Sequence, residues 1–193
     1  MDFPRRLALL LPAALAACAG DGEVVRQDLP ALHYGYLTPL RLNVGVVDVR
    51  DAPPPGPLDA QNPAPPGPAL RQMALDRIGA GGSAGRAVFN IDAAQIVQGG
   101  GGLQGVMAVH LDVLDPGGGR IAFAEARVSR QTTGSRGGLR AGLYEMTRSM
   151  MDDMNIEFEF QVRRSLKAWL QDATTAPPPA PVEQQDLGTP GAS

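Results

Sequence analysis

The chain has 193 residues, of which 44% are hydrophobic and 19% are charged, and this composition suits one folded domain with flexible ends. A formal net charge of -3 without a basic block gives no support to a nucleic-acid partner. The single cysteine excludes an internal disulfide. The 24 glycines and 18 prolines cluster in expected linkers and turns, so the periodic segments between them stay intact.

Residues 1–18 have the pattern of a bacterial export signal. Two arginines at positions 5 and 6 are followed by a short apolar segment, residues 7–15, and then by small residues. The apolar segment is too short to be a stable membrane-spanning helix. The signal ends in a motif that is similar to the bacterial lipobox, Leu15-Ala16-Ala17-Cys18. In a lipobox the cysteine becomes the first mature residue and carries lipid.

Lipidation explains why an exported chain keeps one cysteine. Two alternatives stay open: a plain secretory signal that contains Cys18 by chance, and a twin-arginine signal, although the usual flanking residues are missing. Each buried CH₂ of an acyl chain contributes about 0.8 kcal/mol, so a multiply acylated Cys18 would hold the protein at a bilayer. We expect residues 1–17 to be a lipoprotein signal peptide and residues 18–33 a flexible tether. In families with lipoprotein sorting, an aspartate after the lipidated cysteine tends to retain the protein at the inner membrane. By that resemblance Ala19 favours the periplasmic face of the outer membrane.

A strand, a loop and a helix are expected next. Residues 34–49 hold a strand with alternating apolar residues, and the Val46-Val47 pair predicts a bulge or an edge shift near Gly45. The proline-rich residues 53–68 predict an extended surface loop. Residues 68–78 predict a short helix, with one apolar face.

Three alternating segments then predict an antiparallel meander, in residues 86–97, 103–114 and 120–131. Glycine-rich connections at 98–102 and 115–119 predict the turns between them. The even positions of the last strand are small, which would let a helix approach closely; they are Ala122, Ala124, Ala126 and Val128.

Residues 139–172 predict one long amphipathic helix. Its apolar stripe has steps of three and four residues and consists of Leu143, Met146, Met150, Met154, Phe158, Val162, Leu166 and Trp169. Core packing against the sheet is the first interpretation, because methionine fills gaps in cores. The alternative is a face that also binds a partner, with Met154, Phe158 and Trp169 as the candidate contact residues.

The element order β-α-β-β-β-α predicts an α+β fold. We expect a two-layer sandwich, in which a mostly antiparallel four-stranded sheet carries a short helix and one long C-terminal helix. This domain would span residues 34–172, and the proline- and alanine-rich residues 173–193 would form a disordered tail.

Patterns that could indicate an enzyme or a cofactor site do not have the required context. Residues 81–85 match the G-x-S-x-G pattern of hydrolases, but a helix precedes them and a strand follows, which reverses the order that the nucleophile turn needs. The candidate bases His33 and His110 lie far apart in the chain, and neither glycine-rich run has the setting of a phosphate loop. Two separated histidines and a lipidated cysteine give no metal site. The acidic residues of the long helix point in different directions and predict a solvated face; they are Asp152, Asp153, Glu157 and Glu159.

The lipidated cysteine, the element order and the motif His-Tyr-Gly-Tyr-Leu-Thr-Pro at residues 33–39 resemble small envelope lipoproteins of Gram-negative bacteria. The nearest families are the ABC-type transport auxiliary lipoproteins and the LPS-assembly lipoproteins. The resemblance covers roughly residues 34–170 at the level of topology. The chain departs from the LPS-assembly type directly after the lipobox, where Ala19-Gly20-Asp21 stands.

From the sequence we expect a non-enzymatic, lipid-anchored envelope component without a cofactor other than its lipid. It would act as an accessory, assembly or transport-auxiliary protein that binds an envelope protein or lipid. The alternative is a periplasm-facing carrier that holds a lipid or small ligand between sheet and helix. The sequence does not indicate the oligomeric state.

Overall fold

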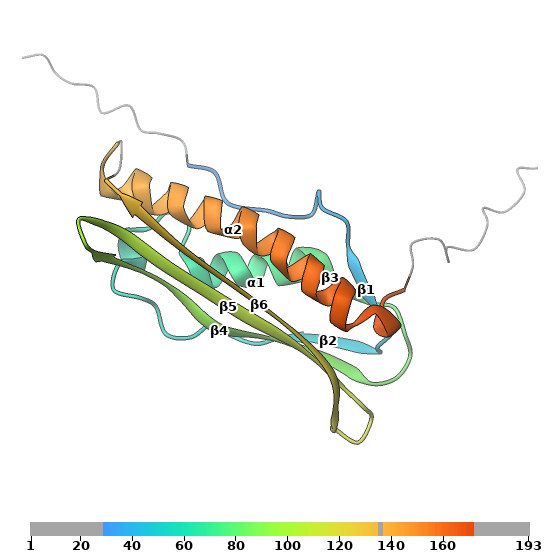
Figure 1. The fold of residues 1–193 in the computed structure, drawn as a ribbon. Coiled ribbons are helices and arrows are strands. Elements are labelled where there is room, and N and C mark those ends of the chain that lie inside the picture. The colour runs from blue at the N-terminus through green and yellow to red at the C-terminus, as the bar shows by residue number, and fades with distance from the viewer. Residues whose placement is uncertain (1–28, 135–136, 172–193) are drawn as a thin grey trace, which may run out of the picture.

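The computed structural model describes residues 29–134 and 137–171 (Figure 1). The elements within them, in chain order, are β1 (Leu40–Leu42), β2 (Val46–Val49), the 3₁₀ helix η1 (Asp59–Gln61), α1 (Pro66–Arg77), β3 (Ile78–Ala80), β4 (Arg86–Gly99), β5 (Gly102–Leu114), β6 (Arg120–Thr133), α2 (Gly138–Ser165) and the 3₁₀ helix η2 (Lys167–Trp169). In this part of the chain, a four-stranded sheet has the order β2-β4-β5-β6, and β1 pairs with β3 in a second sheet.

The α+β sandwich expected from the sequence is confirmed. Strands β4, β5 and β6 form the antiparallel meander, whereas β2 pairs with β4 in the parallel direction because α1 lies in the crossover between them. Both helices lie on one side of the sheet (Figure 1). Helix α1 packs mainly on β4, and α2 packs on β6 and β5.

The turns of the meander follow from their glycines. Gly100 and Gly101 form the two-residue loop between β4 and β5, with φ angles of 59° and 80°. Two positive φ angles suit the right-handed twist of a hairpin, and glycine adopts them without strain. In the next turn the Asp115 N–H donates to the Gly119 carbonyl at 2.9 Å. Both expected turns are confirmed.

A bulge in β4 keeps its apolar side chains in the core. The pairing with β5 shifts between Ile91 and Ala93. Ala87, Phe89 and Ile91 are buried before the shift, and Ala94 and Ile96 are buried after it. The extra residue at the bulge shifts the buried positions from odd to even residue numbers. Without it, strict alternation would turn Ala94 and Ile96 out of the core.

The apolar stripe of α2 is core, as the first interpretation predicts. Met150, Met154 and Phe158 have no exposed surface, and the ring of Phe158 meets that of Phe89 edge to face, with centroids 5.6 Å apart. A Cβ atom on Gly105 of β5 would collide with the sulfur of Met150, so helix and sheet are in close contact at this point. The even face of β6 is also confirmed, because Ala124 and Ala126 are buried in the same core.

The ends of several elements differ from the expected ones. The first strand is two strands in two sheets, because the chain bends at residues 43–45. Helix α1 starts two residues earlier, at Pro66, and Ile78 belongs to the short strand β3, which the sequence pattern did not predict. Helix α2 stops at Ser165 instead of continuing to residue 172.

The proline-rich residues 53–68 are not one extended surface loop, because they include the helix η1 and the start of α1. Asp59 lies in the short helix η1, and Asn62 behind it is buried. The Asn62 amide donates to the Thr147 hydroxyl of α2 at 2.9 Å. Residues 53–68 are thus attached to the helix layer at Asn62.

The residues after α2 return to the small sheet. The Asn43 N–H donates to the Trp169 carbonyl at 2.7 Å, and the Gln171 N–H donates to the Arg41 carbonyl at 2.8 Å. Leu170 forms an antiparallel bridge with Leu42. The described part of the chain thus ends as a third strand-like segment beside β1. Among the described residues, the helices are too short or too polar to span a bilayer.

Candidate functional site

The predicted attachment site lies outside the described residues. Leu15, Ala16, Ala17 and Cys18 all precede residue 29, the first residue that the structure describes. The start of the described chain is held near the beginning of α2, because the Tyr144 hydroxyl donates to the Pro30 carbonyl at 3.0 Å. The described chain therefore begins beside this end of α2 (Figure 1).

The three residues of the predicted partner face do not share one surface. Met154 and Phe158 are completely buried on the side of α2 that faces the core. Trp169 is half-buried against the core beside β1. The stripe that produced this prediction thus packs inside the domain. The exposed apolar residues of α2 are Ile156 and Phe160, which are 73% and 55% exposed.

An ion pair in the helix layer has no counterpart among the sequence-based predictions. Arg77, at the end of α1, has a fully buried side chain that donates to Glu159 of α2 at 2.5 Å and to the Asn155 amide oxygen at 3.1 Å. It also donates to the carbonyl of Thr38 at 3.3 Å. Arg77 thus joins α1, α2 and the segment that precedes β1. Glu159, expected on a solvated acidic face, is only partly exposed and is paired with this arginine.

Two arginines set the charge state of Glu159. Burial acts to raise the pKa of its carboxyl, but hydrogen bonds from Arg163 and Arg77, together with their positive charges, outweigh burial and hold this pKa below its ordinary value. The Arg163 bond, at 2.8 Å, joins two residues that are four positions apart on α2. Glu159 is therefore a structural anion, and its role is to neutralise a buried guanidinium.

Tyr34 is a second buried polar group in this layer. Burial raises the pKa of its phenol, and the nearby Asp152 and Asp76 carboxylates add to the effect. The Tyr34 N–H donates to Asp76 at 2.7 Å, which fixes the segment against α1. Tyr34 thus remains a neutral core residue at physiological pH.

The sheet face opposite the helices carries a mixed surface. Its apolar part consists of Val46, Ile121 and Phe123, each about half exposed. The guanidinium of Arg120 lies 5.2 Å from the centre of the Phe123 ring. Exposed apolar side chains beside an arginine are typical of protein-binding surfaces.

His110 lies on the same face between two carboxylates. Its Nδ1 is 2.7 Å from Asp92, and its Nε2 is 3.5 Å from Asp112. Asp112 is also paired with Arg120, at 3.4 Å. Within the described residues, acidic, histidine and cysteine side chains do not gather into a metal-binding group. The arrangement is a network of surface charges.

The G-x-S-x-G match is a loop between two strands. Ser83 is exposed in residues 81–85, which join β3 to β4. A nucleophile of that class needs a strand before it and a helix after it. Here the short strand β3 precedes it, where a helix was expected, and the strand β4 follows instead of a helix, as expected.

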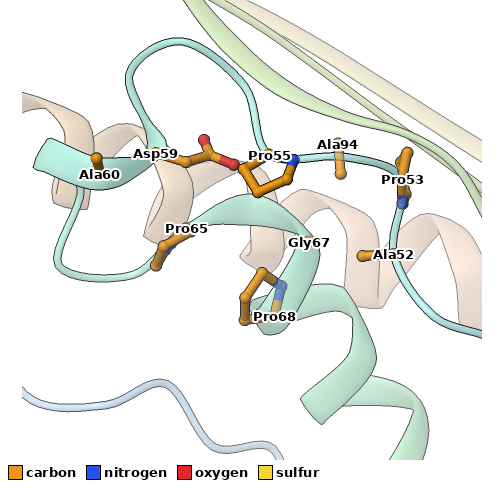
Figure 2. Close-up of a pocket in the computed structure, with 9 residues that line it drawn as sticks. All are labelled: Ala52, Pro53, Pro55, Asp59, Ala60, Pro65, Gly67, Pro68 and Ala94. Carbon is orange, nitrogen blue, oxygen red and sulfur yellow. The ribbon is translucent and has the colours of Figure 1, made fainter.

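An apolar hollow lies at the start of α1 and is shown in Figure 2. It has a volume of about 480 Å³, and its walls are Ala52, Pro53, Pro55, Asp59, Ala60, Pro65, Gly67, Pro68 and Ala94. Asp59 accepts the Gly56 N–H through Oδ2 at 3.0 Å, and among the described residues its Oδ1 has no hydrogen-bond partner. The walls of the hollow are thus mostly apolar, and the Asp59 carboxylate is the charged group among them.

One side of α2 lies along β6, and we call it the edge side; it consists of Gly142, Glu145, Ser149, Asp153, Ile156 and Phe160. Asp153 accepts from Arg130 of β6 at 2.5 Å. A groove of about 410 Å³ lies between the start of this side and the end of β6, with Arg130, Thr132 and Ser149 among its walls. The helical spacing of 100° per residue places Ile156 and Phe160 on the same side as Asp153. Exposed apolar side chains thus continue along the sheet edge.

The comparisons with known proteins leave the family open: no family model matches this chain, and no curated protein matches it.

Proposed function

We propose that this chain is a lipid-anchored lipoprotein of the bacterial cell envelope, a non-enzymatic accessory, assembly or transport-auxiliary component that acts by binding protein or lipid. The observation that carries the proposal is the sequence of residues 1–18, in which a short export signal ends at the only cysteine of the chain. Anchoring through acyl chains on Cys18 would place the domain on the periplasmic face of the outer membrane.

The described surfaces support a binding role. Apolar side chains are exposed at the edge side of α2, at Ile156 and Phe160, and on the open sheet face, at Ile121 and Phe123. Exposed apolar side chains lower the solubility of an isolated domain and are typical of surfaces that a partner covers.

The alternative is a carrier with a lipid pocket between sheet and helix. The space between α2 and the sheet is filled by Met150, Met154 and Phe158, and the helix touches the backbone of β5 at Gly105. This packing favours the binding component over the carrier. Native mass spectrometry of the purified protein separates the two, because a carrier retains a lipid inside the domain under mild conditions, whereas a component that binds only at its surface does not.

Replacing Cys18 with serine tests the anchor. We expect Cys18→Ser protein to leave the membrane fraction or to accumulate as uncleaved precursor, because serine cannot form the thioether to lipid. Ser83→Ala, a change in an exposed loop, is the matched control and should stay in the membrane fraction. Normal processing and unchanged membrane partitioning of the Cys18→Ser protein would contradict the proposal.

Mild crosslinking in cells tests the binding role. We expect a defined envelope protein to be recovered with the wild-type chain, and less of it with a Phe123→Asp variant. Recovery of the chain without any partner under every condition would count against an accessory function.

A further inference from the structure

Strand β6 forms a long, open edge of the four-stranded sheet. It has 14 residues, contains no proline, and pairs with β5 on one side. On its other side, the described part of the chain provides no strand. Proteins usually shorten, bend or cover such an edge, since its free N–H and C=O groups can pair with another strand.

The sequence of β6 is complementary to itself. If two copies of β6 pair in the antiparallel direction with Ala126 opposite Ala126, Glu125 of each copy lies directly opposite Arg127 of the other. Both side chains are exposed on the open face of the sheet. Within the described residues, neither of them takes part in an ion pair or a hydrogen bond that would compete. Opposite charges at directly opposed positions stabilise a strand pair, and this arrangement supplies two such pairs.

Antiparallel pairing of two β6 strands creates a twofold symmetry axis at Ala126, and the apolar part of α2 lies at the same level along the strand. Asp153 contacts Arg130, and Ala126 lies four residues before Arg130, or about 13 Å along the strand. The same length corresponds to about nine residues of helix, so the turn that contains Phe160 lies near the level of Ala126. Phe160 and Ile156 are exposed on the side of α2 that would face the other copy.

The position of α2 on the sheet also suits two helices side by side. Helix α2 packs mainly on β6 and less on β5, so the α2 helices of the two copies would lie on either side of an axis beside β6. The axis is perpendicular to the sheet, so both helix layers lie on the same face.

We propose that the chain binds a second copy of itself through β6, which joins the two sheets into one and packs the edge sides of the two α2 helices together. This inference rests on the proposed function in one way: the second copy is one partner of the proposed binding component. The dimer does not require Cys18 to be lipidated.

A charge exchange tests this dimer, using the purified mature protein in detergent micelles and sedimentation equilibrium at matched density across the micromolar range. We expect a dimer for the wild-type chain. Arg127→Glu and Glu125→Arg each place like charges opposite one another twice, and should raise the dimer dissociation constant about tenfold or more. The double exchange Glu125→Arg with Arg127→Glu restores both pairs and should restore the dimer.

Arg41→Glu is the matched control, because Arg41 is exposed on β1, in the other sheet, and the substitution makes the same change in charge. It should leave the dissociation constant unchanged. Phe160→Glu tests the helix contact independently, and should also weaken the dimer without altering the circular dichroism spectrum.

Three results would overturn the proposal: a wild-type protein that is monomeric at every concentration, equal weakening by Arg127→Glu and Arg41→Glu, or no recovery in the double exchange.

If the protein is monomeric, hydrogen exchange shows whether the edge of β6 is covered. Protected β6 amides in a monomer would assign the edge to another segment of the same chain. Loss of the dimer with correct membrane anchoring rejects this inference alone, whereas loss of anchoring in an intact dimer rejects only the proposed attachment.

Discussion

Arg77 and Glu159 show, at the scale of single residues, how charge holds the helix layer together. The guanidinium is fully buried, whereas the carboxylate reaches the surface. Removing the carboxylate leaves a buried cation with only neutral acceptors, which costs more than a lost surface pair. We expect Glu159→Gln to lower the free energy of unfolding by about 2 kcal/mol, measured by urea denaturation. Glu157→Gln is the control and should have little effect; equal losses would contradict this role for the pair.

The same pair predicts a dependence of stability on pH. The pKa of Glu159 is lower in the folded state than in the unfolded state, so its contribution is complete above the ordinary glutamate value of about 4.3. It is lost as the pH falls through the folded-state pKa. The difference in unfolding free energy between wild type and Glu159→Gln should therefore be constant from neutral pH to about pH 5, and should shrink below pH 4. A difference that grows in acid would show that the sign is wrong.

Gly105 predicts a steric effect. An alanine Cβ there would overlap the sulfur of Met150 and crowd Met146. We expect Gly105→Ala to destabilise the fold by about 1–3 kcal/mol, measured by thermal or urea unfolding. Gly79→Ala is the matched control, since its Cβ would meet open space. A Gly105→Ala protein as stable as the control would mean that α2 lies less close to β5.

Spacing along one element predicts burial well, but it does not predict partners between elements. The steps of three and four residues along α2 predict that Met150, Met154 and Phe158 are core, and all three side chains are fully buried. Arg77 and Glu159 are 82 residues apart, and nothing in the local pattern of either one indicates the other. A basic residue near the end of a helix also has an ordinary local explanation, because it complements the helix dipole.

At the scale of elements, the meander was predictable and the first strand was not. Glycine-rich turns divide residues 86–133 into segments with clear alternation, which defines three strands and their order. Residues 40–49 alternate in a similar way, yet β1 and β2 pair with different strands. Residues 40–49 divide into two strands because each half pairs with a different distant strand. The local sequence indicates this only by the break in the alternation near Gly45.

The segment after α2 predicts a local effect on stability. Trp169 packs on the core, and its carbonyl accepts the N–H of Asn43. We expect Trp169→Ala to lower stability by about 1–2 kcal/mol and to speed hydrogen exchange at Asn43. Lys167→Ala, at an exposed residue of the same η2 helix, should change neither quantity. Unchanged exchange at Asn43 in the Trp169→Ala protein would show that the segment docks without this side chain.

At the scale of the whole molecule, the proposed attachment and the proposed binding surfaces belong to different parts of the chain. The described chain begins beside the start of α2, where Tyr144 contacts Pro30. The open sheet face lies on the side opposite the helices, and the free edge of β6 runs along α2 (Figure 1). If Cys18 carries the lipid, as we propose, residues 18–28 can span at most about 35–40 Å, which would give the anchored domain room to use either surface.

The mass of the mature N-terminal peptide tests the central claim most directly. We predict that the mature chain begins at Cys18 and that this residue carries a diacylglycerol group, with or without an acyl chain on its amine, when the protein is purified from bacterial membranes. A chain that still begins at Met1, or one that is cleaved but carries a free thiol at Cys18, would contradict the account.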